Sequence, residues 1–273
     1  MSETPALFDR TALARHRERA RSNPALFLHE EARADMQDRL SLVNKTFRAP
    51  AIVTPFPDVW RDALPNARIV PDADVLDLQE STHDVVVHAM ALHWANDPVG
   101  QLIQCRRALK PDGLLLVQLL GGQTLQELRA ALGQAEIEIT GGLSPRVAPM
   151  GEIRDLGALL QRAGLALPVA DSAVLTTSYQ TPLHLMHDLR AMGETNAVSS
   201  RLKTATRRDV LLRAMELYAD AYSDDAGRVT ATFEMITLTG WAPDASQPQP
   251  LRPGSAAQRL ADALNTVETP LKD

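Results

Sequence analysis

The sequence predicts an α/β fold, in which a mostly parallel sheet carries helices on both faces. Short apolar runs alternate with amphipathic helical segments along the chain, and two strand patterns come late in it. The run from Leu114 to Leu120 is apolar almost throughout. Such runs are typical of strands that are buried on both faces of a parallel sheet, and the alternation of strands and helices favours that sheet.

Composition limits the classes of function. The 273 residues are 45% hydrophobic, enough to bury a large core. A net charge of −6 disfavours a nucleic-acid partner, because phosphate binding needs clustered cations. Cys105 is the only cysteine, so an internal disulfide is excluded and a reducing, cytoplasmic location is favoured. No apolar stretch reaches the length of a membrane span of about 18 residues, so we expect at most peripheral contact with the inner face of a membrane.

Residues 1–48 are expected to form an N-terminal helical region. Met36, Leu40, Val43 and Phe47 recur at the period of one helix face. A basic run precedes them, and it is most simply a solvated helix face, with contact to anionic lipid or an acidic partner as the alternative. Its arginines are Arg10, Arg15, Arg17, Arg19 and Arg21.

Residues 49–180 are expected to form the sheet core. Short apolar runs predict strands at 51–53, 67–70, 84–88 and 114–120. Asp97 and Pro98 have the residue types of a helix N-cap and first helical position, so a helix from about 98 to 109 is expected. Gly113 would supply the permissive dihedral of the turn that follows. Thr124 and Glu127 have the spacing of a capping box.

A helical insertion is predicted at residues 181–228, between the strand patterns at 173–179 and 229–238, with helices around 182–192 and 207–222. Residues 229–273 would hold the last strand and a proline-rich tail, and the whole chain is expected to be one compact domain. Glu234 is expected to face outward in the alternating pattern of the last strand. His83, His88 and His93 lie five residues apart, which matches neither a helix face nor a strand face, so no metal site is expected.

Several motifs resemble those of class I S-adenosylmethionine-dependent methyltransferases. The shared motifs begin at Asp72-Ala73-Asp74 and continue through 81–86, 91–97 and the turn at 106–113. Later blocks are similar to a narrower branch, which contains a mitochondrial assembly factor of NADH dehydrogenase (respiratory complex I) and its bacterial relatives. Those blocks are 92–94, 119–122, 141–146, 155–164 and 238–243.

The resemblance implies a Rossmann-like fold that binds S-adenosylmethionine outside the carboxyl ends of its strands. By position, Asp72 would accept a hydrogen bond from the adenine amino group, and Ala73 would face the ring. A His-Trp pair would lie near the cofactor, although such a pair is also common in core packing. The expected cofactor-binding residues are Asp72, Ala73, His88, His93 and Trp94. The expected substrate-lining residues are Gly121, Gly122, Arg146 and Trp241.

The glycine-rich cofactor loop of the family is missing. Thr54 to Asp58 stands in its place, without a glycine and with two prolines that lack amide donors. Asp72 comes only 19 positions after Val53, whereas one strand-helix-strand unit takes roughly 30 residues. We therefore expect one strand-helix unit to be lost, together with the acid that would hold the cofactor ribose.

Three functions remain open, and the sequence identifies no catalytic residue. The first is a methyltransferase-family protein that acts on or binds a protein partner, such as a complex I subunit; the branch is also associated with hydroxylation of an arginine on such a subunit. The second is a catalytically inactive assembly or chaperone protein that kept the fold and the partner surface. The third is a carboxyl O-methyltransferase of the malonyl-carrier-protein type, from the biotin pathway, which shares the His-Trp pair.

Overall fold

The computed structural model describes residues 6–248 and 260–267. The chain divides into two compact units, Met1–Pro243 and Asp244–Asp273. The second unit contains a short helix, α9 (Leu260–Leu264), and much of the predicted proline-rich tail lies outside the described residues. Within the described ranges, no helix has the length and apolar character needed to cross a membrane.

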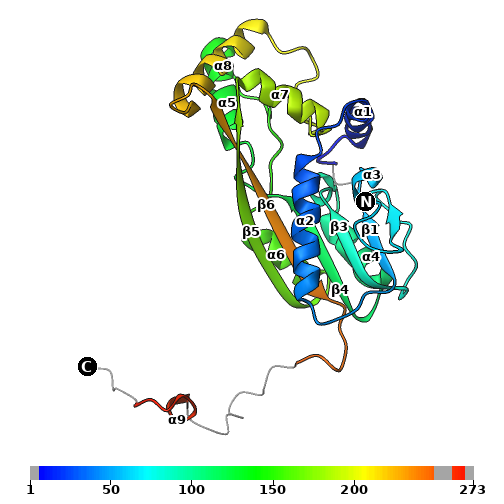
Figure 1. Ribbon diagram of the computed structural model, residues 1–273. Helices are drawn as coiled ribbons and strands as arrows, with labels where there is room; N and C mark the ends of the chain where they lie inside the picture. Colours follow the sequence, from blue (N-terminus) through cyan, green and yellow to red (C-terminus); the bar gives the residue numbers. More distant parts are fainter. Residues whose placement is uncertain (1–5, 249–259, 268–273) are drawn as a thin grey trace, which may run out of the picture. The chain divides into compact units, whose positions relative to one another are not determined.

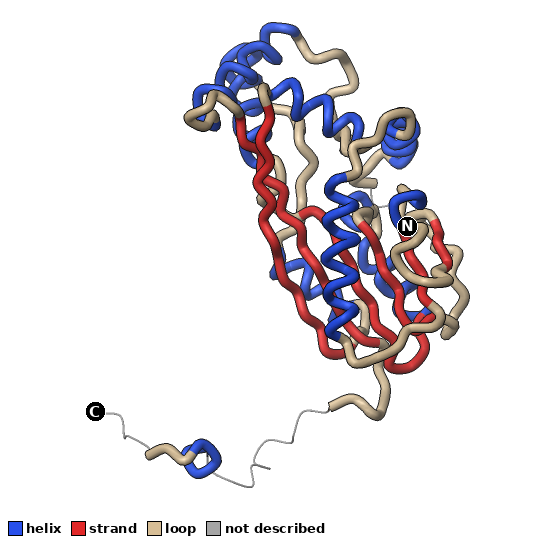
Figure 2. Tube along the Cα trace, viewed as in Figure 1, coloured by secondary structure: helices blue, strands red, loops and turns tan. Residues whose placement is uncertain are grey.

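The first unit is built on a six-stranded sheet in the order β2-β1-β3-β4-β6-β5 (Figures 1 and 2). Strands β2, β1, β3 and β4 run parallel, and β6 is antiparallel to both β4 and β5. The mostly parallel sheet is therefore confirmed. The strands are β1 (Pro50–Val53), β2 (Arg68–Val70), β3 (His83–Ala89), β4 (Leu109–Leu120), β5 (Ala166–Tyr179) and β6 (Val229–Trp241).

Helices cover both faces of this sheet, and two of them, α7 and α8, form the predicted insertion between β5 and β6. The first-unit helices are α1 (Arg10–Ala20), α2 (Phe27–Leu42), α3 (Pro57–Trp60), the 3-10 turn η1 (Leu92–Trp94), α4 (Pro98–Ala108), α5 (Gln126–Thr140), α6 (Ile153–Arg162), α7 (Pro182–Ala191) and α8 (Arg208–Tyr222). Val43 and Phe47, predicted on the same helix face as Met36, lie beyond the end of α2, so that prediction was wrong.

The core has two layers because successive side chains of a strand point to opposite faces. In β3, Val85 and Val87 pack on the side of α2, whereas Val86 packs on the side of α4 and α6. All three are fully buried. Burial on both faces explains why the central strands are almost purely apolar, as the sequence indicated.

The loss of one strand-helix unit is visible between β1 and β2, which pair directly in parallel with Val53 opposite Val70. The only helix between them is α3, four residues long. Trp60 at its end is fully buried, and its indole donates a hydrogen bond to Nδ1 of His29 on α2 (3.1 Å). The short connection is therefore held by a side chain that packs under the sheet.

Two local predictions, the turn glycine and the capping box, were wrong. Asp112, not Gly113, adopts the positive φ (58°), and it lies in the first half of β4. Thr124 and Glu127 form no capping box. The Thr124 hydroxyl accepts a hydrogen bond from the Glu234 amide (3.1 Å), and Glu127 accepts one from the Thr232 amide (3.2 Å).

Glu234 does not face solvent. Because β6 lies between β4 and β5 and is covered on both faces, the Glu234 side chain is buried. Its carboxylate accepts hydrogen bonds from the Gln123 amide (2.9 Å) and from the Ser172 hydroxyl (2.8 Å). The carboxylate therefore joins the end of β4 to both antiparallel strands.

Candidate functional site

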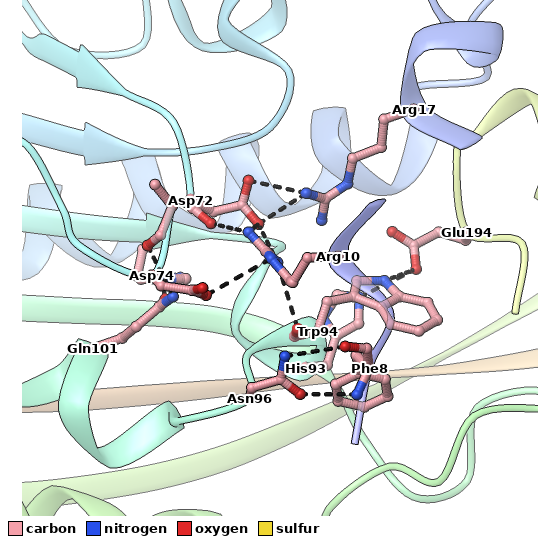
Figure 3. A network of polar contacts seen from close by, with 12 residues as sticks. Phe8, Arg10, Arg17, Asp72, Asp74, His93, Trp94, Asn96, Gln101 and Glu194 are labelled. Carbon is pink, nitrogen blue, oxygen red and sulfur yellow. Dashed lines mark hydrogen bonds and ion pairs between the residues drawn. The ribbon is translucent and has the colours of Figure 1, made fainter. Parts of the chain in front are cut away.

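The residues predicted to hold a cofactor lie at or beyond the carboxyl ends of β2 and β3, and Figure 3 shows Asp72, His93 and Trp94 among a network of polar contacts there. Asp72 and Ala73 follow β2, His88 is in β3, and His93 and Trp94 belong to η1. Parallel strands of an open α/β sheet bring such residues to one edge. Their partners, however, are side chains of the protein itself.

Asp72 is neutralised by two arginines of α1 (Figure 3). Nη1 of Arg17 lies 2.9 Å from Oδ1 and 2.8 Å from Oδ2 of Asp72. Nη1 of Arg10 lies 3.2 Å from Oδ2, and Nη2 of Arg10 donates to the Asp72 carbonyl oxygen. Asp72 and Arg17 are both buried. The carboxylate expected to bind an adenine amino group is thus committed to the N-terminal helix.

The loop from Thr54 to Asp58 is closed by an aromatic side chain. Phe56 is buried, and its ring centroid lies 5.1 Å from that of His29. The amide of Phe56 donates to the Thr54 hydroxyl (3.3 Å), while the prolines at 55 and 57 have no amide to offer. The loop therefore lacks the open row of donors that a glycine loop presents to a cofactor.

The space left between α1 and this edge of the sheet is a cavity of about 280 Å³, slightly below the range of about 300–1,000 Å³ that is usual for ligand pockets. Three arginines, Arg10, Arg17 and Arg21, line it against two carboxylates, Glu18 and Asp72. S-adenosylmethionine carries a positive sulfonium, which the excess of arginines repels. The residues at this position do not fit that cofactor.

His88 and Ala73 are connected through a glutamine. His88 is fully buried, and its Nε2 lies 2.7 Å from Oε1 of Gln101, whose amide nitrogen donates to the Ala73 carbonyl oxygen (3.2 Å). Burial, the largest effect, lowers the pKa of His88, so the ring is neutral near pH 7 and donates from Nε2 to Gln101. This chain of contacts holds α4 against β3 and the loop after β2.

His93 and Trp94 are held by Glu194, a residue that follows α7. The Trp94 indole donates to Oε2 of Glu194 (2.6 Å), and Nε2 of His93 lies 3.2 Å from the same oxygen. The Leu120 amide donates to Nδ1 of His93 (3.4 Å), so Nε2 carries the proton toward Glu194. Burial opposes ionisation of Glu194, but His93, Arg17 and Trp94 outweigh it and lower its pKa.

Glu194 was missed at the sequence level because it lies about a hundred positions from its partners and belongs to no motif. No pattern in the chain marks it, and only the packing of the insertion against η1 brings it to the site. The Phe8 ring packs edge-on against Trp94 at 5.0 Å. The His-Trp pair is therefore a packed and hydrogen-bonded anchor for the helical insertion.

The two glycines after β4 are needed for close approach of acidic side chains. A Cβ on Gly121 would lie 2.7 Å from Oε2 of Glu234 and 2.5 Å from Cδ1 of Ile236. A Cβ on Gly122 would meet the Glu152 carboxylate. Neither glycine is among the lining residues of the clefts described here, so the structure gives them a packing role.

Arg146 lines a cleft of about 540 Å³ between α5, α7 and the segment before α8. Its Nη2 lies 2.6 Å from Oε1 of Glu136, and its Nη1 donates to the Thr206 hydroxyl (2.9 Å). Burial opposes ionisation of Glu136, yet Arg146 and Ser144 lower its pKa. Trp94 lines the same cleft, so two of the predicted site residues meet here.

Trp241 does not join the other predicted substrate-lining residues. It pairs with Leu114, six residues before the end of β4, whereas Gly121 and Gly122 follow that end. Trp241 thus lies away from the two glycines, and Nζ of Lys45 is 5.4 Å from its ring centroid. Within the described part of the chain, no cluster of three His, Cys, Asp or Glu side chains has a geometry suited to a metal ion.

Comparison with known proteins supports the fold. Residues 49–117 match the methyltransferase domain family. The YcgJ protein of Bacillus subtilis aligns over 79% of this chain and 100% of its own, with a TM-score of 0.50 at 12% identity, and this likeness shows the fold alone. The sheet order, this likeness and the family match together show a fold of the class I methyltransferase type.

Sequence similarity identifies the branch. The mitochondrial arginine-hydroxylase NDUFAF5 of Homo sapiens is 36% identical over 84% of this chain and 67% of its own length. The Danio rerio protein is 38% identical over 73% of this chain and 62% of its own length. The chain belongs to the NDUFAF5 family of methyltransferase-type proteins. A malonyl-[acyl-carrier protein] O-methyltransferase of Methylovorus is 33% identical over 65% of this chain and 57% of its own length. The chain spans 43–67% of the length of the NDUFAF5 relatives it matches.

Proposed function

We propose that this chain is a partner-binding member of the NDUFAF5 family. In this proposal the chain assists assembly of a respiratory NADH dehydrogenase and transfers no methyl group. The observation that carries the proposal is the buried ion pair between Arg17 and Asp72, at the position where the family would bind the adenine of its methyl donor. The proposal selects the second of the three functions that the sequence left open.

The free energy of the ion pair supports this choice. Breaking a buried pair costs about 3–5 kcal/mol, whereas micromolar binding supplies about 8.2 kcal/mol. A donor that had to displace Arg17 from Asp72 would therefore keep roughly 3–5 kcal/mol, which corresponds to a dissociation constant between about 0.2 mM and about 5 mM. Methylation of a malonyl carrier protein would need the same donor position, so the ion pair weakens that alternative equally.

The other half of the site supports a role in binding. The 540 Å³ cleft lies within the usual size range of ligand sites. Its walls are held in place by the Glu194 contacts with His93 and Trp94 and by the pair of Arg146 with Glu136. A partner segment can bind there without entering the closed cofactor position.

The proposal is tested in cells of the source organism that lack the chain. Membranes are assayed for assembled NADH dehydrogenase by native electrophoresis and for NADH oxidation, after complementation with wild type or Ala73→Trp. Ala73 is exposed and lines the 280 Å³ cavity, so tryptophan would fill that cavity. Both chains should restore assembly. Assembly unaffected by the deletion, or a folded Ala73→Trp chain that fails to restore it, would contradict the proposal.

A further inference from the structure

We infer that the cleft between α5, α7 and the segment before α8 continues over α1 as one groove, and that this groove binds an acidic polypeptide segment with apolar anchor residues. The inference rests on the proposed partner-binding function and names the chemistry of the partner. Three features of the groove support the inference: its shape, its charge and its apolar lining.

Two hollows form the groove. The first is the 540 Å³ cleft, and the second is a hollow of about 470 Å³ over α1. His16 and Arg201 line both hollows, so the two adjoin. Helix α1 packs beside α7. We call the two hollows together the partner groove.

The charge of the partner groove is opposite to that of the chain. The chain has a net charge of −6, yet the groove is lined by five arginines and only two carboxylates, Glu18 and Glu194. The lining arginines are Arg15, Arg19, Arg146, Arg190 and Arg201. Such segregation of cations into a concave surface attracts an anionic partner.

The internal pairing of the groove shows which arginines can recognise a partner. Arg146 is paired with Glu136, and Arg201 is paired with Asp9 (3.0 Å), so both mainly fix the walls. Arg15 on α1 and Arg190 on α7 are exposed. These two arginines present their charge from opposite parts of the groove and are the principal contacts that we assign to partner carboxylates.

Apolar side chains form much of the first hollow. Leu183 and Leu202 are 40% and 45% exposed, and both line it. Helix α5 and the segment before α6 supply the deeper apolar lining, and α7 adds Met186 and Leu189. An amphipathic segment that places leucine-like anchors in an apolar groove and carboxylates at a basic rim matches this arrangement.

Other polyanions and other peptides match less well. Binding of single-stranded nucleic acid uses exposed aromatic platforms, whereas Trp94, the only Trp, Tyr or Phe among the described residues that line the groove, is 1% exposed. A segment that presents arginine to the cleft would meet three arginines and one carboxylate. These occupants serve as alternative outcomes of the test.

The test measures binding of a fluorescein-labelled peptide of about 15 residues, with leucine at i, i+4 and i+7 spacing and glutamate elsewhere. The same peptide with lysine in place of glutamate is compared with it. The groove variant is Arg15→Glu/Arg190→Glu. Its control is Arg154→Glu/Arg162→Glu, which changes two exposed arginines of α6, outside the groove, and gives the same net charge.

Fluorescence anisotropy should show binding of the glutamate peptide that weakens with salt. The groove variant should bind at least about tenfold more weakly, and the α6 control should stay within about twofold. Equal binding by the groove variant would overturn the inference. Tighter binding of the lysine peptide, of phosphatidylglycerol vesicles or of poly-uridine would also overturn it.

The complementation assay separates this inference from the proposed function. If the deletion leaves NADH dehydrogenase intact while the peptide results hold, the assembly function fails and the groove assignment stands. If wild type and the groove variant restore assembly equally, the groove assignment fails and the assembly function stands. Circular dichroism and thermal melting of each variant confirm that the chain is folded.

Discussion

Arg17 reaches from α1 to Asp72, and its Nη1 lies 2.9 Å and 2.8 Å from the two carboxylate oxygens. The two residues are 55 positions apart, and both are buried. The pair attaches the N-terminal helix to the edge of the sheet at which this class of fold binds its cofactor. It therefore has a structural and a functional consequence, and each can be measured.

Arg17→Met should destabilise the protein by about 2–4 kcal/mol, measured by urea denaturation at pH 7. The loss arises because the buried Asp72 carboxylate keeps only Arg10. It falls below the full cost of a broken pair because Nε and Nη2 of Arg17 have no hydrogen-bond partner among the described residues, and their removal relieves a desolvation cost.

The control for this change is Arg21→Met, because the side chain of Arg21 is 62% exposed. It should alter the free energy of unfolding by no more than about 0.5 kcal/mol. In a double-mutant cycle, Arg17→Met and Asp72→Asn together should cost less than the sum of the single changes. Additive effects would contradict a direct interaction.

Glu194→Gln should destabilise the protein by about 1–3 kcal/mol at pH 7, because a neutral amide replaces a charged acceptor for Trp94 and His93. The pKa of Glu194 lies below its ordinary value of 4.5. Its stabilising effect is therefore complete above pH 4.5 and is lost as the pH falls through the lower folded-state pKa. The unfolding free energies of wild type and Glu194→Gln should therefore become more similar as the pH is lowered. A constant difference down to roughly pH 3.5 would contradict this prediction.

Because of His29, the free energy of unfolding should decrease as the pH is lowered from 6.5 to 4. Burial, the largest effect, lowers the pKa of His29 from 6.5 to about 4, against the opposing charge of Glu194. The unfolded chain takes up a proton below pH 6.5 while the folded chain stays neutral at this position, so stability falls as the pH drops. At pH 5 the loss from His29 amounts to about 2 kcal/mol relative to pH 7.

The comparison for this prediction is His29→Phe. The variant loses the acceptor of the Trp60 hydrogen bond and should be less stable at pH 7, but it has no proton to take up. Its deficit relative to wild type should narrow by about 2 kcal/mol at pH 5, measured by urea denaturation. Parallel pH profiles would show that His29 does not titrate in this way.

Gly121→Ala should destabilise the protein by about 1–3 kcal/mol, because the added methyl group would overlap Glu234 and Ile236. Gly133→Ala is the matched control. Gly133 lies inside α5, and a Cβ there would have its nearest neighbour, in Leu143, at 3.4 Å. That change should be neutral or should stabilise by up to about 1 kcal/mol. A melting temperature below that of wild type for Gly121→Ala, and one equal to or above it for Gly133→Ala, would support the packing role of Gly121.

Periodicity was sufficient for the fold because the central strands and helices are buried on defined faces. The run from Leu114 to Leu120 predicted a strand buried on both faces, and Asp97 before Pro98 predicted a helix start that the structure confirms through the Gly100 amide. The missing strand-helix unit followed from the 19 positions between Val53 and Asp72, compared with the order of motifs in the methyltransferase family. In each case the signal lies in one short stretch of the chain.

The polar contacts were not predictable in the same way, because they join distant segments. Glu234 has the alternation of an exposed residue, but the neighbours of β6 bury it. The partners of Asp72 lie on α1, and Glu194 comes from the insertion. The motif positions from Asp72 to Trp94 lie together at one end of the sheet, whereas the charges that meet there depend on tertiary packing.

The central claim is tested most directly by calorimetric titration of the purified chain with S-adenosylmethionine and with S-adenosylhomocysteine. At about 1 mM ligand, a site with a dissociation constant of 10 μM would stabilise the fold by roughly 2.7 kcal/mol. We expect no micromolar binding and a stabilisation of no more than about 1 kcal/mol at this concentration, because Arg17 holds Asp72. Micromolar binding that Asp72→Ala abolishes would contradict the account and would establish a working cofactor site.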